Sequence, residues 1–443
     1  MTWFLKVFAA AFALLLLLPS HSGALGVEAR HFTLANGLQL VVVPDGRAPV
    51  VTHMVWYPVG SADEPQGKAG IAHFLEHLLF KGTSTLAPGE FSRIIQRHGG
   101  EDNAFTGNDF TAYYQQISRD NLALVMELEA DRMSNLVLSE EDVATEREVV
   151  REERREIEND PAQLLSEQVG AALYVAHPYG KPVIGWMAEV AGLGLDDAMA
   201  FYRANYAPGN AIVVVVGDVT ADDVLGLAQQ HYGRLDNSAA PVARTRTPEP
   251  EPIAARRVVM VDARAASPEF QRSYIAPSHA TAAPGEAEAL EVLAEVLGGG
   301  PTSRLYRALV VGAKAAAYAE AGYSGDGLDG GSFVIHAAPN PGGGLEAIEA
   351  GIEAVIQEAA ANGVSEEELE RARNKLIADS VYAQDDQLEL AIMFGEALTT
   401  GRTLKDVLDW SERVRRVTAE QVRAAAAKVL RIERSVTGVL LPE

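Results

Sequence analysis

The sequence predicts an α+β fold with two homologous domains, each built from a mainly antiparallel sheet flanked by helices. Segments patterned as strands and as helices follow one another in a similar order in the two halves. Each half ends with an apolar run that contains valines and follows a helical segment; the two runs are 211–216 and 435–441. The proline-rich residues 237–254 disfavour regular structure, and we expect an extended, exposed linker there. We therefore place an N-terminal domain at 28–236 and a C-terminal domain at 255–443.

The first 24 residues have the pattern of a secretory signal. A short basic start is followed by the apolar run 7–18 and by Ser22-Gly-Ala24, a small-x-small cleavage site. That run is too short to span a bilayer comfortably, so we predict a signal peptide at 1–24 and a periplasmic or secreted protein. A retained anchor is the alternative. No later segment approaches a membrane span in length, so no stable span is expected after signal removal.

Composition narrows the classes of protein. A chain of 443 residues with 48% hydrophobic and 22% charged residues describes a globular protein with a large core. The absence of cysteine excludes disulfides and thiolate metal sites, and it suits an exported bacterial protein. A net charge of −24 argues against nucleic acid as a partner, because phosphates would be repelled.

The first half begins with strands and continues with helices. Asn36-Gly37 predicts a hairpin turn between two alternating apolar runs. We expect strands at 31–34, 38–43, 50–57, 103–106, 110–117 and 211–216, a helix at 90–98, and mainly helices up to residue 204.

The second half repeats this order. We expect strands at 257–262, 331–336 and 435–441, and helices at 285–297, 344–361 and 365–388. The shared order suggests a duplicated unit.

One helix of the first half carries a metal-binding pattern. In the segment 71–80 helical spacing puts His73 and His77 one turn apart, with Glu76 beside them. The apolar residues take the opposite arc. Neutral imidazoles can hold zinc, and a carboxylate that does not ligate the ion can act as general base, which is the role we assign to Glu76. This H-x-x-E-H order is the inverzincin motif. The alternative is two histidines with ordinary partners and a surface glutamate.

A second helix offers the third ligand that a catalytic zinc site needs. Ser139 begins an N-cap pattern for a helix over 140–159, in which Val149, Val150 and Ile157 mark a buried stripe. Glu153 falls on this stripe, and a buried carboxylate requires a partner such as a metal. Glu146 sits two turns earlier on the same face. We expect the remaining charged residues of the helix to be solvated or paired: Arg147, Glu148, Arg151, Glu152, Arg154, Arg155, Glu156 and Glu158.

With these residues the chain resembles the pitrilysin/insulysin (inverzincin) family of zinc metallopeptidases. Within that family it is most similar to the subgroup that includes mitochondrial processing peptidase, and it looks like an exported bacterial member. The spacing from the motif to Glu153 carries the resemblance, which covers nearly the whole mature chain. Further matching segments are Asn103-Ala-Phe-Thr106, His177-Pro-Tyr-Gly-Lys-Pro-Val-Ile-Gly185 and Tyr206-Ala-Pro-Gly-Asn210. The resemblance implies that His73, His77 and Glu153 bind one Zn²⁺ per chain and that Glu146 supports the site from behind.

The resemblance also implies a mode of substrate binding. The strand that matches Asn103, Ala104, Phe105 and Thr106 is an exposed sheet edge in the family, and it accepts a peptide as an added strand beside the metal. The alternative is that Asn103 and Thr106 only shape a turn and a strand pairing.

One departure from the family pattern predicts a partner. Family members or their partner subunits carry an Arg and a Tyr seven residues apart in the second domain, which orient the substrate carbonyl. Here Tyr318 is preceded at that spacing by Val311, while Arg304 and Arg307 belong to the preceding helix start and are expected to be structural. We therefore expect a heterodimer in which a homologous subunit supplies the Arg-Tyr pair.

The sequence thus predicts a zinc-dependent endopeptidase that cleaves peptides or small unfolded polypeptides in the periplasm, as the metal-bearing subunit of a heterodimer. A non-catalytic peptide-binding or scaffold subunit is the alternative, and the free Glu76 favours the enzyme. Nitrogen and carboxylate ligands also accept manganese or cobalt, so zinc is an expectation from the chemistry of the site.

Overall fold

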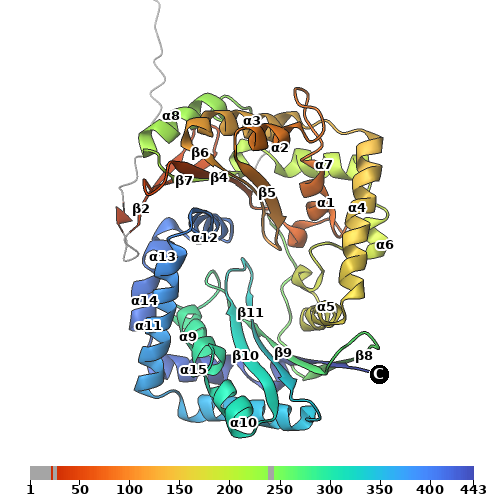
Figure 1. Ribbon diagram of the computed structural model, residues 1–443, viewed down its shortest axis with the longest axis vertical. Coiled ribbons are helices and arrows are strands. Elements are labelled where there is room, and N and C mark those ends of the chain that lie inside the picture. The colour runs from red at the N-terminus through yellow and green to blue at the C-terminus, as the bar shows by residue number, and fades with distance from the viewer. Residues whose placement is uncertain (1–20, 23–26, 238–243) are drawn as a thin grey trace, which may run out of the picture.

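The computed structural model describes residues 21–22, 27–237 and 244–443 (Figure 1). The expected signal peptide lies outside these ranges, except for the two-residue strand β1 (His21–Ser22). Residues 238–243 of the expected linker also lie outside them. In the described ranges, every helix is too short or too polar to cross a membrane.

The first sheet has seven strands in the order β1-β2-β3-β7-β4-β6-β5. Neighbouring strands are antiparallel except for β3 and β7, which run parallel. After β1 the strands are β2 (Glu28–Thr33), β3 (Gln39–Pro44), β4 (Val50–Tyr57), β5 (Glu101–Thr106), β6 (Thr111–Ser118) and β7 (Ile212–Gly217).

The second sheet repeats the topology of the first. Its order β10-β11-β9-β12-β8 corresponds strand by strand to β5-β6-β4-β7-β3, and β8 and β12 are again the parallel pair. Its strands are β8 (Arg256–Val261), β9 (Glu269–Ala276), β10 (Ala316–Ser324), β11 (Gly331–Pro339) and β12 (Ser435–Leu441). The predicted α+β fold with two homologous halves is confirmed.

Helices flank both sheets (Figure 1). Those that follow the first strands are α1 (Ile71–Leu78), α2 (Glu90–Arg97), α3 (Leu122–Asn135), α4 (Glu140–Asn159), α5 (Pro161–Leu173), α6 (Met187–Val190), α7 (Leu195–Asn205) and α8 (Ala221–His231). The second half contributes α9 (Glu286–Gly298), the π-helix η5 (Tyr306–Gly312), α10 (Leu345–Asn362), α11 (Glu366–Ala383), α12 (Gln387–Thr399), α13 (Leu404–Leu408), α14 (Trp410–Arg416) and α15 (Ala419–Val429).

The two halves exchange one helix each. On α12 of the second half, Leu390, Ala391 and Phe394 pack against Trp56 and the other buried side chains on one face of the first sheet. Conversely, α5 of the first half packs Leu165 and Val169 against β12 of the second sheet. Each sheet therefore completes its core with a helix from the other half.

Three elements of the second half differ from the prediction. The strands β9 and β10 were not predicted, and the helix expected over 365–388 ends at Ala383. A new helix begins at Gln387, because the Asp386 side chain accepts the backbone N–H groups of Leu388 and Glu389 as an N-cap.

The expected exposed linker is only partly exposed. Residues 244–254 form no helix or strand, and most are accessible to solvent, as expected. The expectation is wrong for the Arg246 side chain, which is 5% exposed among three aspartates, and for the largely buried Arg244. Acidic partners explain the burial of the two arginines: both pair with the largely buried Asp63 and Asp109, and Arg246 also pairs with the partly exposed Asp329 of the second half.

Candidate metal centre

The metal helix α1 begins with an unusual cap. Gly70 at its N-cap has a φ of 93°, a left-handed conformation that favours glycine, and an added Cβ would lie 2.5 Å from the Ile184 carbonyl oxygen. The buried Glu64 carboxylate accepts the backbone N–H groups of Gly70 and Ala72, each at 3.0 Å. Burial raises the pKa of Glu64 to about 8, while these two hydrogen bonds oppose the rise. Glu64 therefore fixes the start of the helix that carries the motif.

The two faces of α1 divide as the spacing predicts. Ile71, Phe74, Leu75 and Leu78 are buried in the core of the first half. His73 and His77 lie on the other side, with ring centroids 4.7 Å apart and nearly perpendicular planes. The helical repeat thus brings both imidazoles to one surface of the N-terminal domain.

The third predicted ligand comes from α4, although the buried stripe of this helix differs from the predicted one. Ser139 forms a capping box with Asp142, as its pattern indicates. The fully buried positions are Val143, Val150 and Arg154, whereas Val149 is 40% exposed. The prediction of a buried Val149 is therefore wrong, whereas Arg154 is paired with Glu158, as expected. Arg154 is buried because it pairs with Glu158 and with Glu167 of α5.

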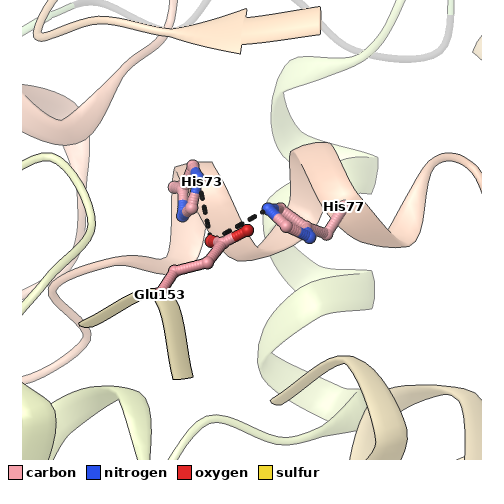
Figure 2. Close-up of side chains that lie close together, drawn as sticks. All are labelled: His73, His77 and Glu153. Atoms are coloured by element: carbon pink, nitrogen blue, oxygen red, sulfur yellow. Dashed lines mark ion pairs between the residues drawn. The ribbon is translucent and has the colours of Figure 1, made fainter. Parts of the chain in front are cut away.

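The structure brings His73, His77 and Glu153 together (Figure 2). Glu153 Oε2 lies 3.9 Å from His73 Nε2 and 3.4 Å from His77 Nε2. Two ligands bound about 2.1 Å from a tetrahedral zinc ion are separated by about 3.4 Å, so this spacing suits one ion between the three side chains. It is the one such group of three or more His, Asp or Glu ligands in the described part of the chain. The donor set of two nitrogens and one oxygen therefore fits zinc.

Glu146 lies behind the site rather than in it. Its Oε2 is 3.2 Å from His77 Nδ1, and its Oε1 contacts the Lys81 ammonium. A carboxylate at Nδ1 holds the imidazole so that Nε2 faces the metal position. The sequence placed Glu146 in this supporting position but did not single out Lys81, which helical spacing puts one turn after His77.

The pKa values of the two imidazoles shift in opposite directions. Burial and the His77 charge lower the pKa of His73 to about 3, so this ring is neutral and can ligate a cation at neutral pH. Burial also lowers the pKa of His77, but the Glu146 hydrogen bond and the Glu153 and Glu76 charges outweigh it and raise the pKa overall. The carboxylates that raise the pKa of His77 stabilise positive charge at this position, whether a proton or a metal ion carries it.

The predicted base, Glu76, stands beside the ligands and outside their group. Its Oε2 accepts a hydrogen bond from Thr106 Oγ1 at 2.5 Å. Burial raises the pKa of Glu76, while the Thr106 hydrogen bond and the His77 charge oppose the rise. A higher pKa makes the carboxylate a stronger base, as proton abstraction from water requires.

A cleft of about 680 Å³ opens over these groups. Of the four residues predicted to bind substrate, Ala104, Phe105 and Thr106 line it together with His73, Glu76 and Glu153. Asn103 does not line the cleft and accepts the backbone N–H of Ala104 through its own side chain. Within the described chain, β5 pairs with β6 alone, so its other edge is free beside the cleft.

Sequence reasoning missed other residues around the site. Glu64 left no local signal, because it caps α1 from a position six residues before Gly70. Glu156, Asp160 and Gln163 line the cleft from the end of α4 and the start of α5. Helical spacing on α4 would have pointed to Glu156, which lies three residues after Glu153.

Comparison with known protein families shows to which family this chain belongs. A family model described as Insulinase (Peptidase family M16) matches residues 40–186, and one described as Peptidase M16 inactive domain matches residues 192–376. The chain belongs to the insulinase family, M16. The resemblance given by the motif and its spacing is thus confirmed.

Relatives of this M16 chain include named proteases. It is 34% identical to the zinc protease PqqE of Helicobacter pylori over 371 residues, which cover 83% of this chain and 82% of that protein. It is 30% identical to an uncharacterized zinc protease of Mycobacterium leprae, over 93% of each chain.

Solved structures share the fold. The crystal structure of a protease from Helicobacter pylori superposes with a TM-score of 0.87 at 32% identity, over 94% of this chain and 100% of that chain. The periplasmic protease PqqL of Escherichia coli superposes at 0.80 with 19% identity, over 96% of this chain and 48% of that chain. The latter likeness shows the fold alone.

Proposed function

We propose that this M16 protein is a zinc-dependent endopeptidase that cleaves peptides or small unfolded polypeptides. The observation that carries the proposal is the position of Glu76, which lies beside the group His73, His77 and Glu153 but is not a member of it. A structural metal site has no use for a free carboxylate, whereas hydrolysis requires one. The naming of relatives as zinc proteases agrees with this proposal.

Each residue of the site has a separate role in the proposed reaction. His73, His77 and Glu153 would hold the zinc ion, which when bound would polarise the scissile carbonyl and acidify water. Glu76 accepts the proton that the attacking water loses and passes it to the leaving amine nitrogen. Thr106 fixes the orientation of the Glu76 carboxylate through its hydroxyl hydrogen bond. Lys81 and Glu146 keep the His77 ring in position.

The edge of β5 is the proposed site for the peptide backbone. A peptide added as a strand there would pass Ala104, Phe105 and Thr106, which line the cleft next to Glu76. Backbone pairing holds extended chains of many sequences, and this suits peptides and unfolded polypeptides better than folded proteins.

The decisive experiment compares the wild type with Glu76→Gln at equal metal content. We expect hydrolysis of an unstructured peptide library to fall by about 10²- to 10⁴-fold, because the general base is lost while the ligands remain. Peptide binding should persist. Unchanged cleavage would remove Glu76 from the mechanism. Absence of cleavage by the wild type, even with the partner subunit described below, would favour the alternative of a peptide-binding or scaffold subunit.

We propose a homologous partner for the same site. Val311, at the position of the missing arginine, is 58% exposed on η5, and Tyr318 is 40% exposed on β10. A subunit that carries the Arg-Tyr pair would supply the groups that orient the substrate carbonyl. Mixing the chain with such a homologue should raise kcat/KM and produce a heterodimer in sedimentation. Full activity of the pure single chain would contradict the need for a partner.

We place the mature protein in the periplasm. The pattern of residues 1–24 supports export. Mass spectrometry of the protein from fractionated cells should find a mature N-terminus at Leu25. A full-length chain in the membrane fraction would instead support a retained anchor.

A further inference from the structure

A cluster of charges, most of them largely buried, joins the two halves outside the group of metal ligands. We call it the ionic hub: Asp63, Asp109, Arg244, Arg246 and Asp329. Arg246 donates to Asp63 at 2.8 Å and to Asp329 at 2.7 Å, and it also pairs with Asp109. Arg244 donates to Asp63 at 2.9 Å and to the Asp109 carbonyl oxygen at 2.5 Å.

The hub gathers segments that bear directly on the site. Asp63 ends the short helix η1 (Ser61–Asp63), next to Glu64, which caps α1. Asp109 lies in the turn between β5 and β6, three residues after Thr106. Both segments belong to the N-terminal half, and they position the metal helix and the substrate strand.

The C-terminal half reaches the hub through the turn between β10 and β11. There the Leu328 backbone N–H donates to Asp109 at 2.9 Å, and Asp329 pairs with Arg246. The motif segment around His177 completes the contact, because Tyr179 donates its hydroxyl hydrogen to Asp109 at 2.5 Å and His177 lies 3.2 Å from Asp329. Through Arg244 and Arg246 of the linker, residues of both halves are thus connected in one cluster.

Burial strengthens the ion pairs of the hub and fixes their geometry. Asp109 is 3% exposed and Arg246 is 5% exposed, so their charges are poorly screened by water. The planar fork of Arg246 meets three carboxylates at once, and this fixes its geometry more tightly than an ammonium would. A hub of this kind restrains the angle between the halves as well as their proximity.

The metal cleft is lined by the N-terminal half, and the C-terminal half contributes to a neighbouring cavity. Beside the metal cleft lies a second cavity of about 460 Å³, and Ile157 and Gln163 line both. The far wall of the second cavity comes from the C-terminal sheet, with Phe270 and Gln271 of β9 and His336 of β11. A peptide that extends beyond β5 into this cavity therefore meets a surface whose position depends on the angle between the halves.

We propose that Arg246 is a positioning residue for extended substrates: through the ionic hub it holds the C-terminal sheet against the metal cleft, so that a long peptide finds one continuous groove. This inference rests on the proposed peptidase function. A short peptide that contacts β5 alone does not need the C-terminal wall, and its binding is independent of Arg246. The hub therefore sets the preference for substrate length.

The test measures peptide affinity in the Glu76→Gln background, so that hydrolysis does not interfere. A labelled peptide of about six residues, the length of β5, is compared with one of about twenty residues, which reaches about 65 Å when extended. Adding Arg246→Ala should weaken binding of the long peptide between about tenfold and a hundredfold, and that of the short one less than about threefold. Zinc affinity should not change, because all three ligands lie on the N-terminal half.

Two further variants keep the test independent of folding. Arg246→Lys retains the charge without the fork and should give a smaller loss for the long peptide than Arg246→Ala. Asp329→Asn removes the carboxylate from the C-terminal side, at a position that is more than a third exposed, and should reproduce the loss for the long peptide. These variants decide the question if Arg246→Ala does not fold.

Arg47→Ala is the matched control. Arg47 also connects the halves, through Asp385 and the Gln384 carbonyl oxygen, but it is half exposed and belongs to neither α1 nor β5. It should leave both affinities unchanged. An equal loss for both peptides in the hub variants, no loss for either, or the same selective loss in Arg47→Ala would overturn the inference. The hub variants could selectively weaken binding of the long peptide although the wild type, even with its partner subunit, never hydrolyses that peptide. In that case the inference about the hub holds and the proposed peptidase function fails.

Discussion

Lys81 shows how one residue outside the motif can support the metal site. It holds one oxygen of Glu146, whose other oxygen faces His77 Nδ1. Lys81→Met keeps the length of the side chain and removes its charge, so Glu146 loses its anchor. We expect zinc affinity, measured by chelator competition, to fall about ten- to a hundredfold.

Lys68→Met is the control for this change. Lys68 lies before α1 and pairs with Asp197 at 2.8 Å, away from Glu146 and His77. Its replacement should leave zinc affinity unchanged. Equal zinc affinity in Lys81→Met and the wild type would show that Glu146 orients His77 without help.

At the scale of residues, local spacing could be read from the sequence and burial could not. His73, Glu76 and His77 share one side of α1 because a single helical repeat determines their order. On α4 the same reasoning brought Glu153 to the site but misplaced Val149, and it did not reveal the burial of Arg154. The burial of Arg154 depends on Glu167 of α5, which no periodicity within α4 reveals.

At the scale of elements, Arg304 ties the start of the π-helical segment to two helices. It donates to both oxygens of Glu368, each at 2.8 Å, and to the Gly363 carbonyl oxygen that follows α10. The predicted structural role of Arg304 agrees with these contacts. The Arg304 hydrogen bonds lower the pKa of Glu368 to about 2 from its usual 4.5.

This lowered pKa predicts a pH dependence of stability. As pH falls below 4.5, the unfolded chain takes up the proton before the folded one does, so this contribution is present above pH 4.5 and is lost towards pH 2. Glu368→Gln should reduce the free energy of unfolding at pH 7 by about 1–2 kcal/mol, with a smaller difference from the wild type at pH 3. Urea denaturation at both pH values measures this.

Glu367→Gln is the matched change on the same helix. Glu367 is almost fully exposed and meets Arg371 only at 3.5 Å. Its replacement should alter stability by less than about 0.5 kcal/mol at either pH. A difference between the Glu368→Gln variant and the wild type that grows towards acid pH would contradict the assigned pKa direction.

The elements that the sequence did not predict are those that depend on distant partners. Strand β12 was predicted with its observed ends, because its apolar run is buried on both faces and stands out locally. Strand β10 lies at the sheet edge and consists mainly of small and polar residues without a clear apolar alternation, so its strand character comes from pairing with β11. The duplication was visible from the order of elements, but the exchange of α5 and α12 was not.

At the scale of the whole molecule, this exchange makes the halves interdependent. Leu390, Phe394 and their neighbours on α12 belong to the second half in sequence but complete the core on one face of the first sheet. Unfolding the second half would strip this helix from β4 and β7 and expose buried apolar surface, including Trp56. We therefore expect the two sheets to unfold in one cooperative transition.

Phe394→Ala tests this coupling, because the ring is fully buried between the halves. The change should lower the free energy of unfolding by about 3–5 kcal/mol through the lost burial and the cavity left behind. Hydrogen exchange under native conditions should show equal losses of protection in β7 of the first sheet and β12 of the second, since the slowest amides of both report the same global opening. Val381→Ala, at an exposed position near the end of α11, should leave protection unchanged in both. A loss confined to β7 would mean that the second sheet stays folded without α12 in place, and the halves would then be separate folding units.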